Sequence, residues 1–239
     1  MISFTKIRGN YMTDEDWVQY AKKHKKEVLN EIIGNNQKEE QRRAIVLAGG
    51  PASGKSELRD TLLEVEDNMC VVDTDEFRKI FPNYNGSNAK VYQRASSYLT
   101  DFCFSRLVDK KYSITLDTTF AGRKAIQNVT RLLDHGYMVD LYYIYQNPIV
   151  SWHYAQKRDR IVPVEVFKRT TEKAFENVKV AYSEFKNNPN FTLILHNQEI
   201  KSGQICEDEK QFDLISKILK VNWSDIYADG NKKNNEKIR

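Results

Sequence analysis

Apolar residues in this chain gather in two kinds of segment. Short runs rich in β-branched residues, such as RAIVLAGG (43–50), are apolar on both faces of an extended chain. Such runs are typical of strands buried in a parallel sheet that helices cover on both sides. Longer segments are amphipathic, as residues 14–33 are, where Trp17 and Ala21 lie one helical turn apart. This spacing is typical of a helix, and Thr13 is suited to cap it.

The two kinds of segment alternate along the chain, which predicts an α/β fold. We expect a three-layer sandwich around a mostly parallel sheet of about five strands, because the strands are apolar on both faces. The predicted strands are residues 43–50, 69–75, 112–119, 137–145 and 191–196. The predicted helices are residues 14–33, a segment from about 55, and residues 89–109, 122–135, 148–158, 163–186 and 208–220.

Length and charge suggest three parts. A chain of 239 residues suffices for one α/β domain with a substantial core, but not for two. Residues 1–41 hold the first helix and a polar linker, residues 42–220 hold the alternating elements, and residues 221–239 form a basic tail. Of the net charge of +4, the last nine residues carry +3, so the remainder is nearly neutral. A nearly neutral body argues against a nucleic-acid partner.

Hydropathy and cysteine usage indicate the compartment. No apolar run reaches the roughly 18 residues of a membrane span. The first residues, MISFTKIRGN, lack the hydrophobic core of a secretory signal. We therefore expect a cytoplasmic protein with no membrane partner. Cys70, Cys103 and Cys206 form no C-x-x-C pair, so we expect reduced thiols in or near the core.

The strongest chemical signal is the stretch GGPASGKS (49–56), which has the spacing G-x4-G-K-S. Glycines let backbone N–H groups turn inward toward phosphate oxygens, and the following helix directs its positive end to the same place. Lys55 would neutralise the β- and γ-phosphates of a nucleotide, and the hydroxyl of Ser56 would ligate Mg²⁺. The alternative is a tight glycine turn with a surface lysine, but the strand before it and the helix after it favour phosphate binding. The candidate nucleotide-binding residues are Gly49, Gly50, Pro51, Ala52, Ser53, Gly54, Lys55, Ser56 and Glu57.

Three aspartates follow predicted strands: Asp73 and Asp75 close the second strand, and Asp117 closes the third. Ligands of a parallel sheet bind outside the carboxyl ends of its strands. Strand alternation would direct Asp73 and Asp75 to the same side. One carboxylate there can take the proton of an attacking hydroxyl, and another can hold Mg²⁺. The alternative is helix capping, which suits Asp75 before EFRKI but explains all three aspartates poorly.

Basic residues crowd a junction between two predicted helices, QKRDRIVP (156–163). Guanidinium groups stabilise the negative charge that develops in phosphoryl transfer, which suits Arg158 and Arg160. The alternative is a solvated helix end with cations on the helix dipole. Spacing alone leaves the two interpretations even. Placement after the fourth strand, where small kinases carry an arginine lid, favours a lid.

The chain resembles the zeta-toxin family of P-loop kinases, in particular its stand-alone bacterial members. The resemblance runs from about Lys22 to Leu219 and implies a kinase-like P-loop NTPase fold. Its carrying stretches are AKKHKKE, GGPASGKSEL, VVDTDEFRKIFPNYNGSN, SITLDTTFAG, YYIYQNPIVSWHYAQKR and IVPVEVF.

The resemblance assigns roles to individual residues. It implies that Lys55, Asp75 as general base, and the lid arginines Arg158 and Arg160 are catalytic. The chain departs from the family at three places: Asp101 and Asp117 stand where glutamates are usual, and the loop between the lid arginines is shorter. The candidate acceptor-side residues are Asp73, Arg78, Asn88, Asp101, Asp117 and Thr119, and the candidate Mg²⁺ ligands are Ser56 and Asp117.

The resemblance also implies a reaction. Studied zeta toxins use ATP and Mg²⁺ to phosphorylate UDP-N-acetylglucosamine, and a small helical antitoxin blocks their nucleotide site. We expect transfer from ATP to a small-molecule hydroxyl, with this nucleotide sugar or a related one as the acceptor. The polar segment FPNYNGSNAKVYQRASS (81–97) is either an acceptor-side loop or an ordinary connection. Residues 14–33 either pack near the nucleotide site or add a core helix. Two other functions stay open at this point: a nucleic-acid end kinase, and an ATP-binding regulatory module without catalysis.

Overall fold

A six-stranded sheet forms the centre of the computed structural model, which describes residues 6–7, 10–158 and 162–227. The strand order is β4-β5-β3-β6-β7-β8, and every neighbouring pair is parallel except β7 and β8. The five parallel strands expected from the sequence are therefore confirmed. The strands are β3 (Arg43–Ala48), β4 (Cys70–Asp73), β5 (Ile114–Asp117), β6 (Met138–Tyr145), β7 (Phe191–Asn197) and β8 (Ser202–Ile205).

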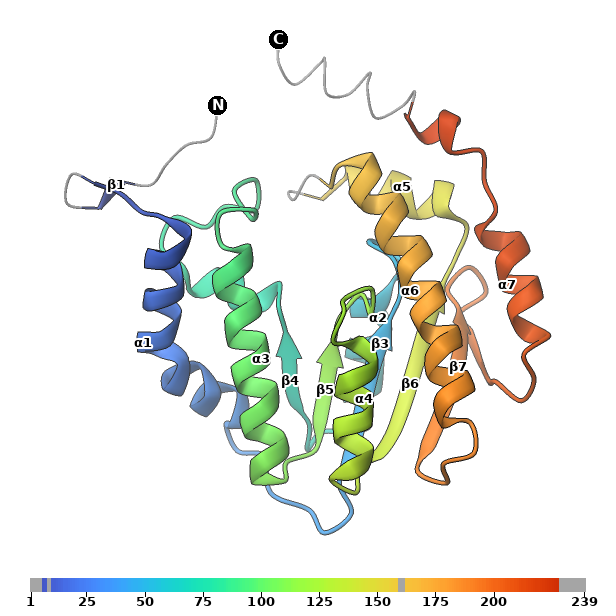
Figure 1. The fold of residues 1–239 in the computed structure, drawn as a ribbon, viewed down its shortest axis with the longest axis horizontal. Helices are drawn as coiled ribbons and strands as arrows, with labels where there is room; N and C mark the ends of the chain where they lie inside the picture. The colour runs from blue at the N-terminus through green and yellow to red at the C-terminus, as the bar shows by residue number, and fades with distance from the viewer. Residues whose placement is uncertain (1–5, 8–9, 159–161, 228–239) are drawn as a thin grey trace.

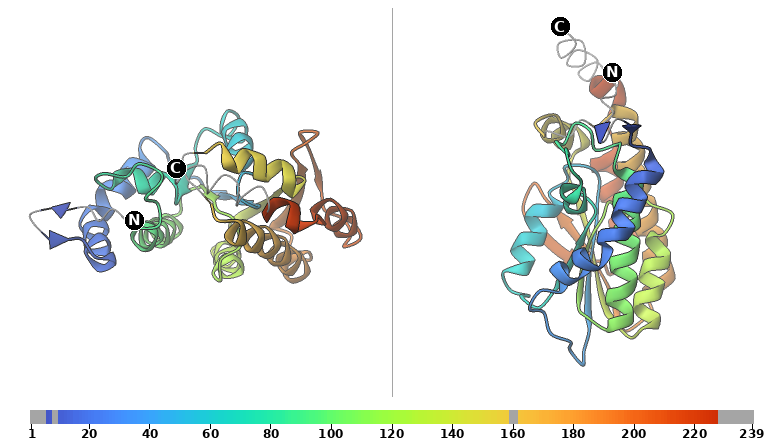
Figure 2. Two further views of the ribbon diagram at one scale, coloured as in Figure 1. Left: turned by 90° about the horizontal axis from the view of Figure 1, so that it is seen from above. Right: turned by 90° about the vertical axis from the view of Figure 1, so that its left-hand side faces the viewer.

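Helices cover both faces of the sheet, as Figures 1 and 2 show. Alternate residues of β3 serve the two layers: Val46 packs into the cluster that contains α1, α3, α4 and α6, whereas Leu47 packs with Leu58 and Leu62 of α2. The predicted three-layer sandwich is confirmed. The helices of the described residues include α1 (Asp14–Ile33), α2 (Lys55–Leu63), α3 (Gln93–Lys110), α4 (Ala125–Asp134), α5 (Pro148–Gln156), α6 (Val164–Phe185), α7 (Gln211–Leu219) and the 3-10 helix η1 (Glu76–Ile80).

Two strand features differ from the sequence-based expectation. The antiparallel edge strand β8 was not predicted, because its residues SGQI are all exposed and carry no apolar pattern. A short hairpin of β1 (Lys6–Ile7) and β2 (Asn10–Tyr11) was also missed, because two-residue strands leave no periodicity.

The second strand ends at Asp73, so the expectation that Asp73 and Asp75 share one strand face was wrong. The chain turns after Asp73, whose Oδ1 accepts a hydrogen bond of 2.7 Å from the backbone N–H of Asp75. Asp75 then precedes η1 but makes no side-chain capping bond to it. The side chain of Asp75 therefore does not cap η1, contrary to the alternative interpretation.

The N-terminal helix α1 packs into the same core as the sheet. Trp17 is 1% exposed and meets the rings of Phe81 and Tyr92 edge-on, at centroid distances of 6.0 and 4.9 Å. Thr13 caps the helix as expected, in a reciprocal capping box with Asp16. The helix is thus a core element that supports the segment after η1.

The described part of the C-terminal segment is also packed. Ile226 is 2% exposed, and Val221 and Trp223 are partly buried beside it. The division of the chain at residues 41 and 220 stays a prediction, and the basic residues from 231 onward lie outside the described residues. Cys70, Cys103 and Cys206 are buried free thiols, as expected. Among the helices of the described ranges, none combines the length and apolarity needed to cross a membrane.

The packing of α1 predicts that Trp17→Ala lowers the free energy of unfolding by about 3–5 kcal/mol, the usual cost of a large buried aromatic. Urea unfolding measures this change. Val65→Ala is the control, because Val65 is 81% exposed and its loss should change stability little. A variant at Trp17 as stable as the wild type would show that α1 is not part of the core.

Candidate active site

The phosphate loop joins β3 to α2 and is held from both sides. The backbone N–H of Gly49 donates to the carbonyl of Thr119, after β5, at 3.3 Å. A Cβ at Gly49 would lie 2.4 Å from the carbonyl oxygen of Ile144 in β6. This clash could be relieved only by a shift of the β6 backbone. Gly54 has φ +94 and serves as the N-cap of α2. The glycines of the motif are therefore required by close packing and by backbone conformation.

Lys55 lies folded over this loop. Its Nζ donates to the carbonyl oxygens of Gly49, at 3.0 Å, and Gly50, at 2.8 Å. The pKa of Lys55 is lowered to about 8, mainly by burial; the nearby cation of Arg158 also lowers it, whereas the carboxylates of Asp117 and Asp73 raise it. The ammonium is therefore poorly solvated and is positioned to exchange its carbonyl partners for an anion.

Asp73 and Asp117 lie side by side at the ends of β4 and β5, and Arg59 of α2 bridges them. Arg59 Nη1 donates to Asp73 Oδ2 at 2.8 Å and to Asp117 Oδ2 at 3.1 Å. All three side chains are largely buried. Burial and the neighbouring charge of Asp73 raise the pKa of Asp117 to about 6, and burial also raises the pKa of Asp73. Arg59 holds together two carboxylates that would otherwise repel each other.

Arg59 was not predicted as a site residue from the sequence. The signal that could have found it is its spacing: it follows Lys55 by four residues, so both side chains leave the same face of α2. A cation on that face, one turn beyond the phosphate loop, must approach the ends of the neighbouring strands.

Arg78 fixes the position of Asp75. The side chain of Arg78 is 2% exposed, and its Nη1 pairs with the carboxylate of Asp75. Its Nη2 donates to Gln93 Oε1 of α3 at 2.6 Å, and Gln93 Nε2 donates to Ser97 Oγ at 3.1 Å. The Asp75 side chain stays 54% exposed, so it is anchored and still accessible. Arg78, expected on the acceptor side, thus holds the candidate base.

These groups line one cleft of about 690 Å³, a volume typical of small-molecule sites. Arg158 reaches it from the end of α5, whereas Arg160 lies outside the described residues. Lining residues that were not predicted from the sequence come from α2, α3, α6 and the segments that follow β4 and β5. The sequence-predicted residues that line the cleft are Pro51, Ala52, Ser53, Lys55, Ser56, Asp73, Asp75, Arg78, Asp101, Asp117, Thr119 and Arg158. The added lining residues include Arg59, Gln93, Ser97, Thr100, Lys124 and Asn128.

Two predicted residues make contacts away from the cleft lining. Glu57 accepts from Lys201 Nζ at 2.8 Å and from Gln198 Nε2 at 2.7 Å, so it ties α2 to the turn between β7 and β8. Asn88 donates to the carbonyl of Asn83 at 2.7 Å and thereby closes its own loop. Their roles toward ligands stay predictions.

Asp101 faces the cleft from α3 and forms an ion pair of 2.5 Å with Lys124. Both side chains are about half exposed, so the pair is open to exchange with a polar ligand. Asp101 is therefore already engaged by a cation.

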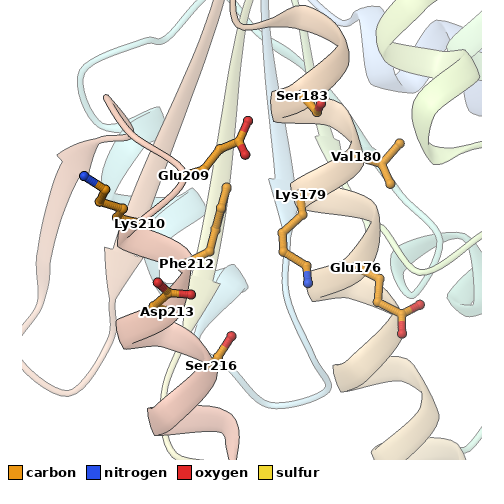
Figure 3. Close-up of a pocket in the computed structure, with 9 residues that line it drawn as sticks. All are labelled: Glu176, Lys179, Val180, Ser183, Glu209, Lys210, Phe212, Asp213 and Ser216. Atoms are coloured by element: carbon orange, nitrogen blue, oxygen red, sulfur yellow. The ribbon is translucent and has the colours of Figure 1, made fainter.

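A second hollow lies between α6 and α7 (Figure 3), and none of the sequence-predicted site residues lines it. Its two glutamates pair with lysines: Glu176 with Lys173 at 3.1 Å, and Glu209 with Lys186 at 2.8 Å. These ion pairs are exposed, whereas the charged side chains of Arg59, Asp73 and Asp117 in the first cleft are largely buried.

The first cleft offers oxygen donors of the kind that Mg²⁺ prefers. Ser56, Asp73 and Asp117 all line it, and magnesium sites commonly combine one or two carboxylates with phosphate oxygens and water. Within the described residues, no cluster of three or more His, Cys, Asp or Glu side chains forms a complete metal cage. The donor set therefore fits a metal that arrives with phosphates.

Removing the bridging cation should be costly. Arg59→Ala leaves two buried carboxylates unpaired, and breaking such an arrangement costs about 3–5 kcal/mol. Because the pKa of Asp117 lies above its unfolded value of 3.8, the folded state binds protons more readily than the unfolded state. Arg59 lowers the pKa of Asp117, so its removal raises that pKa further, and the variant should gain more stability than the wild type as the pH falls from about 7.5 to about 5.

Thermal melts of both proteins at the two pH values test this, and the difference in Tm should narrow at the lower pH. Arg106→Ala is the control, because its pair with Asp109 is exposed and long, at 3.7 Å. An equal Tm difference at both pH values would contradict the bridging role of Arg59.

Comparison with known proteins identifies the family of this chain. The Zeta toxin family model matches residues 26–202. Toxin zeta of Enterococcus hirae and toxin zeta of Streptococcus pyogenes are each 32% identical over 126 residues, which cover 48% of this chain and 43% of each relative. The match thus spans less than half the length of these curated relatives.

Solved structures show the same fold at low identity. A structure of the PezAT chromosomal toxin-antitoxin system of Streptococcus pneumoniae aligns with TM-score 0.61 and 16% identity, over 94% of this chain and 97% of that chain. A crystal structure of AvrRxo1-ORF1:-ORF2 with ATP aligns with TM-score 0.61 and 17% identity, over 89% and 76% of the two chains. Since the family model matches well over half of its residues, the chain belongs to the Zeta toxin family.

Proposed function

We propose that this protein is an ATP-dependent kinase that transfers the γ-phosphate to a hydroxyl group of a small molecule. The observation that carries the proposal is the convergence of Lys55, Asp75 and Arg158 on one cleft. Membership of the Zeta toxin family supports it. A regulatory module that only senses ATP would not need an accessible, anchored carboxylate opposite the phosphate loop.

The mechanism follows from these positions. The loop amides and Lys55 hold the phosphates of ATP, and the acceptor hydroxyl lies beside Asp75. Its oxygen forms a bond to the γ-phosphorus, Asp75 takes its proton, and the bond from the γ-phosphorus to the bridging oxygen breaks, so ADP leaves with the electron pair. Arg158 stabilises the charge that develops on the transferred group. Mg²⁺, held by Ser56 and Asp117, supplies further charge neutralisation when bound.

The acceptor that we propose is UDP-N-acetylglucosamine or a related nucleotide sugar. The support is the family, together with the polar side chains of Asp101, Thr119 and Asn128 on the cleft wall. Asp73, Arg78 and Asn88 would complete the acceptor side, Arg78 through its hold on Asp75.

A small helical antitoxin is the proposed protein partner, since two structural neighbours are described as a toxin-antitoxin system and a two-component ORF1:ORF2 complex. We place the reaction in the cytoplasm, where ATP and nucleotide sugars occur.

Asp75→Asn should lower the rate of phosphate transfer by about 10²- to 10⁴-fold, because the amide cannot accept the hydroxyl proton. Binding of ATP should be retained. Transfer of label from γ-labelled ATP to UDP-N-acetylglucosamine, or to a bacterial metabolite extract, measures the rate. Asp67→Asn is the matched control, since Asp67 is exposed and lies away from the cleft.

Full transfer by the Asp75 variant would overturn the base assignment. Transfer only to oligonucleotide ends would instead identify a nucleic-acid end kinase, and binding without transfer to any acceptor would identify a regulatory module.

ATP binding should be coupled to proton uptake. Since the pKa of Lys55 is about 8, much of this side chain is neutral in the free protein at about pH 8.5. Phosphate oxygens favour the ammonium, so binding should take up roughly half a proton or more at that pH. Calorimetry of ATP binding in buffers of different ionisation enthalpy measures the uptake. Lys55→Arg keeps the charge but cannot titrate, so it should take up none, and an unchanged uptake in that variant would exclude Lys55 as the source.

A further inference from the structure

The segment that follows α7 shares an apolar cluster with the phosphate loop. Ile226 is 2% exposed and shares a cluster with Ala52 of the loop, Trp152 and Ala155 of α5, and Phe167 of α6. Figure 1 shows the segment rising from α7 toward the end of the molecule where α5 and the start of α6 lie. A part of the chain that was assigned to a basic tail therefore contributes to the surroundings of the nucleotide site.

Ala52 is the residue of the loop that this cluster holds. Its φ is +56°, in the left-handed region that residues with a Cβ rarely adopt. Its side chain is 6% exposed within the cluster, and its carbonyl accepts a hydrogen bond of 3.0 Å from the buried amide of Gln146. Contacts from outside the loop thus maintain a backbone conformation that the alanine itself disfavours.

The same cluster also holds both ends of the basic junction. Ala155 precedes Arg158 by three residues, and Val162 follows it by four, and both belong to or pack against the cluster. Phe167 meets the ring of Trp152 edge-on at 5.2 Å and the ring of Trp223 at 6.3 Å. One apolar cluster therefore contains residues of the C-terminal segment, the phosphate loop and the two sides of Arg158.

We propose that residues 221–226 brace the phosphate loop through Ala52, so that affinity for ATP depends on this segment. The residues act as positioning residues, since they bear on the phosphates through the loop and through Arg158. The inference rests on the proposed function in taking ATP as the ligand.

Ile226→Ala tests the brace, with Ile215→Ala as the matched control. Ile215 is 1% exposed but lies in α7 and packs in the main core, away from Ala52. Both substitutions should lower Tm, but only Ile226→Ala should raise the Kd of a fluorescent ATP analogue, by about tenfold. Kd is measured well below both melting temperatures. If Ile226→Ala does not fold, Ile226→Val and Ile215→Val make the same comparison, with a smaller expected ratio.

Ala52→Gly separates the loop from the cluster. Glycine adopts a positive φ freely but lacks the methyl group that the cluster contains. In the Ala52→Gly background, Ile226→Ala should therefore weaken ATP binding less than it does in the wild type. Additive effects of the two substitutions, or equal effects of Ile226→Ala and Ile215→Ala on Kd, would overturn the proposal. A wild-type protein that binds no ATP would instead overturn the proposed function.

Discussion

The bridge from Arg59 to Asp73 and Asp117 is the interaction on which the geometry of the cleft depends. Two buried carboxylates on adjacent strands repel each other unless a cation lies between them. Arg59 supplies that cation from the helix that also begins with Lys55, so the bridge fixes this helix against the ends of β4 and β5. The bridge thereby fixes the phosphate loop relative to the turn that leads to Asp75.

Different elements of the fold position the other reacting groups. Asp75 is anchored by Arg78, and through Gln93 to α3, which α1 supports with Trp17. Arg158 depends instead on the junction between α5 and α6. Burial lowers the pKa of Lys55 more than the nearby carboxylates of Asp117 and Asp73 raise it, so a bound anion would stabilise its ammonium further. Lys55 and Arg158 therefore favour a ligand that carries several negative charges, whereas Asp75 favours a neutral hydroxyl group.

The sequence predicted those parts of the fold and site that local patterns determine. The glycine spacing before Lys55 and the apolar runs identified the phosphate loop and the parallel strands, because each needs a particular residue type at each position. The roles of Arg59 and Arg78 could not be predicted this way, since an arginine on a helix pairs with whatever the sheet brings near. Ile226 was assigned to a tail for the same reason. Its packing depends on where α7 ends relative to the rest of the fold, and the residues near Ile226 in the sequence do not indicate this position.

A structure with Mg²⁺ and a non-hydrolysable ATP analogue tests the central claim most directly. The account predicts that the loop from Gly49 to Ser56 encloses the phosphates and that the γ-phosphorus faces the carboxylate of Asp75 across space for one hydroxyl group. Phosphates bound outside the loop, or a γ-phosphorus directed away from Asp75, would contradict it.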